Sequence, residues 1–212
     1  IEAMKLAYAD LHRYNADPRR VRVPVEGLLS KGYGAERGAL VNPRAANGAV
    51  MPGKPKGSDT VYLTVVDREG NIASWIQSIF QNFGSGIAVE GMGFPLQNRG
   101  GGFSLDPAHP NVLEGGKRPF HTIIPGFMMK GNQRMGFGIM GGPNQPQAHA
   151  QFVSNVVDYG MNVQQAMESP RFTKVGPGGF DVAIESRVPL NTLQELSALG
   201  HEVALRRPYT QE

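Results

Sequence analysis

The chain has 212 residues, 40% hydrophobic and 18% charged, which is typical of a globular core rather than a disordered or fibrous segment. A net charge of +3, with no basic patch interleaved with aromatic residues, excludes an obvious nucleic-acid partner. Cysteine is absent, which excludes disulfides, zinc–thiolate sites and a cysteine nucleophile. No apolar run approaches the roughly 20 residues of a membrane helix, so we expect no membrane partner either.

Helices are predicted in the first part of the chain. Apolar residues recur at helical spacing over residues 1–15, and Asp17-Pro18 ends that helix. A second short helix is expected within 24–37. Residues 41–58 are rich in Asn, Pro, Gly and Lys, which is typical of a linker or surface loop where chains are cut. Because the chain begins inside a helical pattern, we expect it to be an internal or truncated piece of a longer polypeptide.

A β-hairpin follows this loop directly. The alternating pattern of residues 60–66 predicts one strand, 67–71 a turn, and 72–80 the return strand. With the last residue of the first strand opposite the first residue of the second, Thr60 lies across from Ser78. Opposed side chains share a face of the sheet, with Cβ atoms about 5.5 Å apart or less. The pattern therefore predicts a hydroxyl group beside Thr60.

The later elements are shorter and separated by glycine-rich loops. Residues 81–103 predict short strands and loops that expose backbone groups. The remaining expected elements are a second hairpin over 121–129 and 134–140, a helix after Gly141-Gly142-Pro143, a helix over 191–199 and a strand over 202–205. The five histidines show no ligand spacing, so we expect neither a metal site nor a cofactor.

Thr60 is the candidate nucleophile. A threonine at the start of a chain can use its own α-amino group as a base, because an amine pKa near 8 leaves a useful neutral fraction at pH 7. Cutting the bond before Thr60 would create that amine. The plain alternative is a structural threonine at the beginning of a strand.

The order of motifs resembles the γ-glutamyltranspeptidase family of N-terminal-nucleophile hydrolases. Residues 60–104 and 117–173 are similar to its small subunit, and residues 1–59 to the end of its large subunit. The matching stretches include Ala7-Tyr8-Ala9-Asp10, Gly70-Asn71, Phe83-Gly84-Ser85-Gly86-Ile87, Lys117-Arg118-Pro119, Gly141-Gly142, Asp158-Tyr159-Gly160 and Ser169-Pro170-Arg171-Phe172. The resemblance implies an α+β fold, a partial four-layer αββα sandwich in which segments 1–59 and 60–212 form one domain. It also implies a precursor that cuts itself between Asp59 and Thr60. By resemblance the protein is periplasmic or extracellular, and a cytoplasmic location stays open.

The catalytic roles implied by the resemblance fall on four residues. Thr60 resembles the nucleophile and Ser78 its hydroxyl partner, which is a threonine in most members. Gly141 and Gly142 resemble the oxyanion hole. A glycine pair between a strand and a helix offers bare N–H groups near a helix N-terminus, which suits a developing negative charge. The alternative for this pair is an ordinary strand-to-helix turn.

The implied substrate-binding residues depart from the family pattern. Members that bind a γ-glutamyl group usually read Asn-Asn-Gln-x-Asp-Asp-Phe-Ser, whereas residues 97–104 here read Gln-Asn-Arg-Gly-Gly-Gly-Phe-Ser. Asn98 is kept, Arg99 replaces the glutamine, and glycines replace both acids. His121-Thr122 replaces a serine pair, and Phe80 stands where an asparagine contacts substrate. An arginine would repel the substrate ammonium and favour an acid; the alternative is a solvated surface arginine.

The sequence therefore predicts a γ-glutamyltransferase-like amide hydrolase or acyltransferase that forms an acyl-enzyme on Thr60. Its expected partners are a small γ-glutamyl amide, such as glutathione, or a related acyl amide, together with the remainder of the large subunit. One alternative is a hydrolase of glutaryl or cephalosporin-type acyl amides. The other is an uncleaved, non-catalytic homologue.

Overall fold

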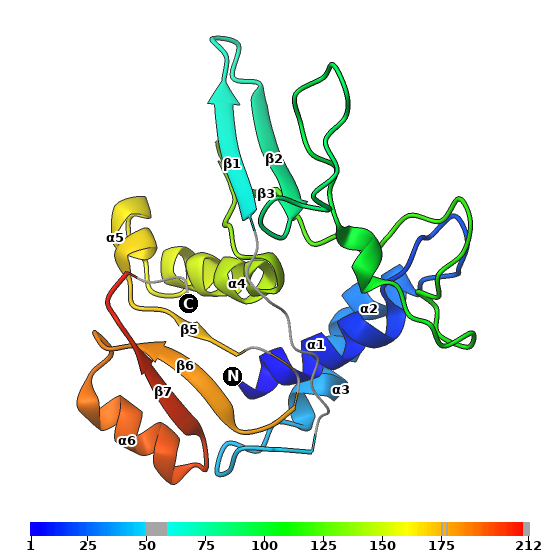
Figure 1. The fold of residues 1–212 in the computed structure, drawn as a ribbon. Helices are drawn as coiled ribbons and strands as arrows, with labels where there is room; N and C mark the ends of the chain where they lie inside the picture. Colours follow the sequence, from blue (N-terminus) through cyan, green and yellow to red (C-terminus); the bar gives the residue numbers. More distant parts are fainter. Residues whose placement is uncertain (50–58, 175, 177, 210–212) are drawn as a thin grey trace. The chain divides into compact units, whose positions relative to one another are not determined.

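The computed structural model describes residues 1–49, 59–174, 176 and 178–209, which form two compact units (Figure 1). The described part of the first unit comes from residues 1–49, 99–121, 174, 176 and 178–208. The described part of the second comes from 59–98 and 122–173, with Tyr209. Most of the predicted linker, residues 50–58, lies outside the described residues.

The first unit begins with three helices, α1 (Glu2–Tyr14), α2 (Val25–Leu29) and α3 (Lys31–Ala39). The first helix is confirmed, but the single helix expected over 24–37 is wrong. Ser30 breaks it because its backbone is extended, with φ −71° and ψ 142°. The Ser30 hydroxyl accepts a hydrogen bond from Tyr33 N at 3.1 Å and so caps the new helix.

The rest of the first unit contains a short 3₁₀ turn η1 (Arg99–Gly102), strand β6 (Asp181–Glu185), helix α6 (Leu190–Ala198) and strand β7 (Glu202–Arg206). β6 and β7 pair in parallel, and α6 connects them. The closing helix and strand are confirmed, whereas β6 was missed. Val182 and Ile184 on β6 are almost fully buried, so this strand belongs to the core of the unit.

The second unit begins with the predicted hairpin. β1 (Asp59–Val66) pairs antiparallel with β2 (Ile72–Phe80), and Thr60 lies opposite Ser78. The expected register is therefore confirmed. It shifts between Asp59 and Thr60, because Asp59 pairs with Phe80 and leaves Ile79 as an extra residue on β2.

A second hairpin packs on one face of the first. It consists of β3 (Gly126–Lys130) and β4 (Gln133–Phe137), shorter than the strands expected over 121–129 and 134–140. Gly136 allows the close approach, because a Cβ there would lie 2.7 Å from Thr64 Oγ1 and 3.2 Å from the Tyr62 hydroxyl. The hydroxyls of Tyr62 and Ser74 bond to each other at 2.8 Å within the first hairpin, and Ser74 Oγ donates to Gly126 O of β3 at 3.0 Å, which links the two hairpins.

Helix α4 (Gln145–Val157) covers the other side of the second hairpin, after a short turn η2 (Gly142–Asn144). The Phe137 ring of β4 lies 5.1 Å from the His149 ring and 5.4 Å from the Phe152 ring. The order in this unit is thus hairpin, hairpin, helix. Sequence reasoning missed two further elements here, α5 (Val163–Glu168) and β5 (Phe172–Thr173).

Candidate active site

Thr60 and Ser78 form a hydroxyl pair at the open end of the first hairpin. Thr60 is 7% exposed, and its Oγ1 donates to Ser78 Oγ at 3.0 Å. Ser78 Oγ also accepts from Phe80 N at 2.9 Å. The antiparallel register brings the two hydroxyls together, and the Phe80 amide fixes the second one. The predicted neighbour of Thr60 is therefore confirmed as a hydrogen-bonded partner.

The chain after Ser78 has an unusual backbone. Phe80 has a φ of +77°, a region that non-glycine residues rarely adopt and that often marks a functional site. Asn98 fastens this segment, since its Oδ1 accepts from Gln81 N at 3.1 Å and its Nδ2 donates to Gln81 Oε1 at 2.8 Å. Its backbone N also donates to Ile79 O at 3.2 Å. Asn98 thus holds the bulge in place rather than pointing freely from a loop.

Gly141 and Gly142 form the turn that leads into α4. Their φ angles are +119° and +52°, which a side chain would strain, and Gly142 is buried. Asn144 N donates to Gly141 O at 2.9 Å and closes the turn. The first amides of α4 follow at once, so the turn lies at the positive end of that helix. Such a turn can stabilise an oxyanion.

Thr122 is 8% exposed, and the segment that carries it is bonded to the start of α4. Ile124 N, two residues further on, donates to Gln145 Oε1 at 2.9 Å. Gln145 is fully buried and is the first residue of α4, so it ties the segment that carries Thr122 to the glycine turn. Sequence reasoning missed Gln145. A glutamine repeated in Gln145-Pro146-Gln147 just after the glycine pair was the available signal.

Arg99 and His121 belong to the first unit. Arg99 is only 3% exposed, so the alternative of a solvated surface arginine is wrong. Partial desolvation lowers the pKa of the His121 imidazole, and the positive charges of Arg99 and Arg118 lower it further. His121 is accordingly neutral at pH 7, and the positive charge of this region comes from the two arginines.

Two classes of feature are absent from the part of the chain that the structure describes. No three His, Asp or Glu side chains gather where they could hold a metal ion. No described helix is long and apolar enough to cross a membrane.

Known proteins resemble this chain in sequence and in fold. It is 37% identical over 217 residues to the glutathione hydrolase-like YwrD proenzyme of Bacillus subtilis, covering 99% of this chain and 40% of that protein. It is 34% identical over 218 residues to the oxamate amidohydrolase proenzyme of Klebsiella pneumoniae, covering 100% and 40%. The solved cephalosporin acylase of Bacillus halodurans matches with a TM-score of 0.85 and 43% identity, over 97% of this chain and 37% of that one.

These relatives place the fold in the class of N-terminal-nucleophile hydrolases. The family described as Gamma-glutamyltranspeptidase matches residues 1–211, and the chain belongs to that family. The resemblance deduced from the motifs is thereby confirmed. The chain spans about 40% of the length of the two curated relatives, so what the whole protein does is a matter for proposal.

Proposed function

We propose that this chain carries the catalytic centre of a self-cleaving amide hydrolase in which Thr60 is the nucleophile. The observation that supports it best is the 3.0 Å hydrogen bond from Thr60 Oγ1 to Ser78 Oγ, inside a strand pair that orients both groups. The membership of the family and the word "proenzyme" in the names of both relatives support a precursor that is processed.

The first step is the cut. Thr60 Oγ attacks the carbonyl carbon of Asp59, the C–N bond breaks, and the Thr60 nitrogen takes up the hydroxyl proton. Water then hydrolyses the resulting ester, which leaves a carboxylate on Asp59 and a free amine and hydroxyl on Thr60. The register shift between Asp59 and Thr60 supports this site, since the regular pairing of the two strands is interrupted opposite the bond to be cut, with Ile79 as the extra residue on β2.

The second step is turnover on substrate. The free Thr60 amine accepts the Thr60 hydroxyl proton while Oγ attacks the substrate carbonyl, and the leaving amine takes a proton as the amide bond breaks. Water, our preferred acceptor, hydrolyses the acyl-enzyme, while an acceptor amine would give transfer. Ser78 orients Thr60 Oγ throughout, and the N–H groups of Gly141 and Gly142 stabilise the oxyanion.

The packing of the two hairpins supports the oxyanion role. Gly136 approaches Thr64, and a Cβ at Gly138 would lie 2.2 Å from the Tyr62 ring. The two strands therefore run past each other in opposite chain directions. If the same progression continues for two more residues beyond Gly138, the backbone just before Gly141 comes to the level of Thr60. The glycine turn then follows immediately, within the same unit.

For the substrate we propose a small amide whose acyl part ends in a carboxylate, in the manner of glutaryl or cephalosporin side chains. The charge of Arg99 favours this, because a planar guanidinium suits bidentate binding of a carboxylate and repels an ammonium group. Two of the relatives are named for acylase and oxamate amidohydrolase activities. We assign substrate contacts to Arg99, His121 and Thr122, and to Phe80 and Asn98 at the bulge. A γ-glutamyl amide such as glutathione is the competing substrate.

We further propose that the second unit contributes to a four-layer αββα sandwich that includes both segments, 1–59 and 60–212. Its hairpin, hairpin and helix supply three layers. The outer face of the first hairpin is apolar and open, with Val61 56%, Leu63 47% and Trp75 58% exposed. The remainder of the large subunit would supply the covering helices.

The experiment is mass spectrometry of the full-length polypeptide and of its Thr60→Ala variant. We expect the parent to separate into two pieces with Thr60 as the new N-terminus, and the variant to stay intact and inactive. A parent chain that remains intact after long incubation would support the uncleaved, non-catalytic alternative. Comparing glutaryl-p-nitroanilide with γ-glutamyl-p-nitroanilide then decides the substrate, and a clear preference for the second would refute the role of Arg99.

A further inference from the structure

The first unit combines residues from both sides of the predicted cut. Residues 1–49 come before Thr60, whereas 99–121 and 174–208 come after it. If the bond before Thr60 is cut, as the proposed function requires, no covalent link between Asp59 and Thr60 remains. The non-covalent contacts of this unit then help to hold the two pieces together.

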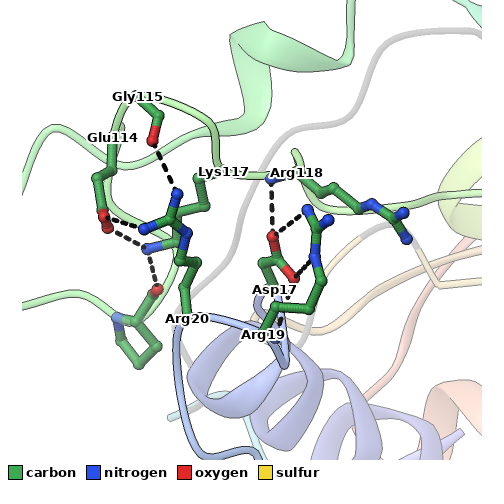
Figure 2. A network of polar contacts seen from close by, with 8 residues as sticks. Asp17, Arg19, Arg20, Glu114, Gly115, Lys117 and Arg118 are labelled. Atoms are coloured by element: carbon green, nitrogen blue, oxygen red, sulfur yellow. Dashed lines mark hydrogen bonds and ion pairs between the residues drawn. The ribbon is translucent and has the colours of Figure 1, made fainter.

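Asp17 makes the most buried polar contact between the two segments in Figure 2. Its side chain is 0% exposed, and Oδ2 accepts from the backbone N of Arg118 at 3.0 Å, across 101 positions of sequence. The Arg19 guanidinium binds the same carboxylate through Nε at 3.1 Å and Nη2 at 2.9 Å, and Arg19 N donates to Oδ1 at 3.1 Å. We call Asp17, Arg19 and Arg118 the Asp17 cluster.

The electrostatics favour the charged form of the carboxylate in this cluster. The hydrogen bonds from Arg19 lower the pKa of Asp17 most, and the bond from Arg118 N lowers it further, while burial opposes them. A buried carboxylate with four N–H donors is stable only while all of them stay in place. Withdrawing the Arg118 backbone would leave that charge short of a donor, so separation of the segments is opposed here.

A weaker set of contacts surrounds the cluster (Figure 2). Arg20 lies 3.6 Å from Glu114 and 3.5 Å from Gly115 O, and both charged side chains are nearly half exposed. Water screens such a pair, so it contributes little. Lys117 Nζ binds Pro110 O at 2.8 Å and thereby shapes the loop that carries Arg118. The Arg20–Glu114 pair therefore offers a natural comparison on the same surface.

A second contact region lies elsewhere in the first unit. Ala46 N donates to Leu199 O at 2.6 Å, and Gly179 N donates to Gly48 O at 3.3 Å. Gly48 has no room for a side chain, because a Cβ would lie 2.3 Å from the Phe180 ring. Lys5 Nζ also lies 5.8 Å from the centre of the Phe180 ring, and His201 Nε2 lies 3.8 Å from Glu2 Oε1. Several contacts in the described part of the chain therefore join the pieces, and the Asp17 cluster contributes a fully buried carboxylate that accepts a hydrogen bond from the other piece.

We propose that the Asp17 cluster is an interface between the two products of the cut, by which the segment before Thr60 stays bound to the segment after it. Its partner is the other piece of the same polypeptide. The proposal rests on the proposed function for the natural cut, but the contact itself exists in the uncut chain.

The test uses the full-length polypeptide with Thr60→Ala, so that it does not cut itself, and with a site for a specific protease placed within residues 50–58. Protease nicking then produces the two pieces whether or not the natural cut occurs. The measurement is the dissociation constant of the nicked pieces, by native mass spectrometry and by size exclusion over a range of urea concentrations. Asp17→Asn is compared with Glu114→Gln, which removes the half-exposed pair with Arg20 and the longer 3.7 Å pair with Lys117 but leaves the Asp17 carboxylate in place.

We expect Asp17→Asn to weaken association of the nicked pieces about tenfold or more, because a hydrogen-bonded buried charge is lost, and Glu114→Gln to change it less than about threefold. The uncut Asp17→Asn chain should be affected much less, since the tether keeps the contact at a high effective concentration. Equal dissociation constants for the parent and Asp17→Asn would overturn the proposal. If the uncut Asp17→Asn chain does not fold, Asp17→Glu takes its place, because it keeps the charge but displaces the carboxylate. We then expect nicked Asp17→Glu to dissociate more readily than nicked Glu114→Gln. Dissociation constants equal to that of the parent for both variants would overturn the proposal.

Discussion

Replacing Ser78 by alanine tests whether the hydroxyl pair organises the nucleophile. The change removes the acceptor for Thr60 Oγ1 at 3.0 Å and for Phe80 N at 2.9 Å. Taking the acceptor from a buried donor costs about 1–3 kcal/mol, and Thr60 is only 7% exposed. At about 2–4 °C per kcal/mol for a chain of this size, a loss of about 2 kcal/mol lowers the melting temperature by roughly 4–8 °C.

The effect on the cut is expected to be larger than the effect on stability. Without its partner, Thr60 Oγ1 can rotate away from the Asp59 carbonyl, and a displacement of about 1 Å costs about a hundredfold in rate. The assay is a gel time course of precursor disappearance in the full-length protein, together with thermal unfolding of the uncut fraction. Ser78→Thr is the matched control, because it keeps the oxygen and adds a methyl group that suits a strand.

Two results would refute this reasoning. One is a Ser78→Ala precursor that is cut at the parent rate, which would mean that the 3.0 Å contact has no part in the chemistry. The other is a Ser78→Thr variant as slow as Ser78→Ala, which would mean that the shape of the serine matters rather than its hydroxyl.

Three further predictions concern packing, specificity and pH. Gly138→Ala places a Cβ 2.2 Å from the Tyr62 ring, so melting of the variant should show a loss of about 1–3 kcal/mol or more, whereas Gly101→Ala, which meets nothing within 4 Å, should be neutral. Arg99→Leu should lower kcat/KM at least about tenfold more for glutaryl-p-nitroanilide than for γ-glutamyl-p-nitroanilide, and an equal loss on both would contradict the specificity role. The pKa of Asp17 lies below its usual 3.8 in the fold, so its stabilising effect is complete above that value and disappears as the pH falls through the folded pKa. The difference in free energy of unfolding between the parent and Asp17→Asn should therefore be constant above about pH 5 and shrink in stronger acid.

The first hairpin was predictable because two independent signals agree on it. The alternation of residues 60–66 assigns the faces, and the turn at 67–71 sets the register, so Ser78 could be placed beside Thr60 by counting. The bulge at the open end could not be foreseen. Phe80 adopts a positive φ without being glycine, and only the surrounding structure imposes such a conformation.

The elements that were missed are short, and their stability comes from contacts with distant residues. β6 has five residues, and the burial of Val182 and Ile184 depends on pairing with β7. Helix α5 has six residues, too few for a helical period to stand out, although its capping box of Asn162 and Gln165 was readable. Gln145 was missed because burying a glutamine requires a partner that the local sequence does not reveal.

The proposed chemistry and the proposed specificity draw on different parts of the chain. Thr60 would supply both nucleophile and base, and Ser78 and the glycine turn belong to the same unit, so the amide-cutting steps need no residue from the other. Arg99 and His121 belong to the first unit, whose 118–121 loop is attached through Arg118 to Asp17. A family built this way can change the charge that it recognises without disturbing the hydroxyl pair. Under the proposed function, Arg99 in place of the expected glutamine, together with glycines in place of both acids, is a change of substrate and not a loss of catalysis.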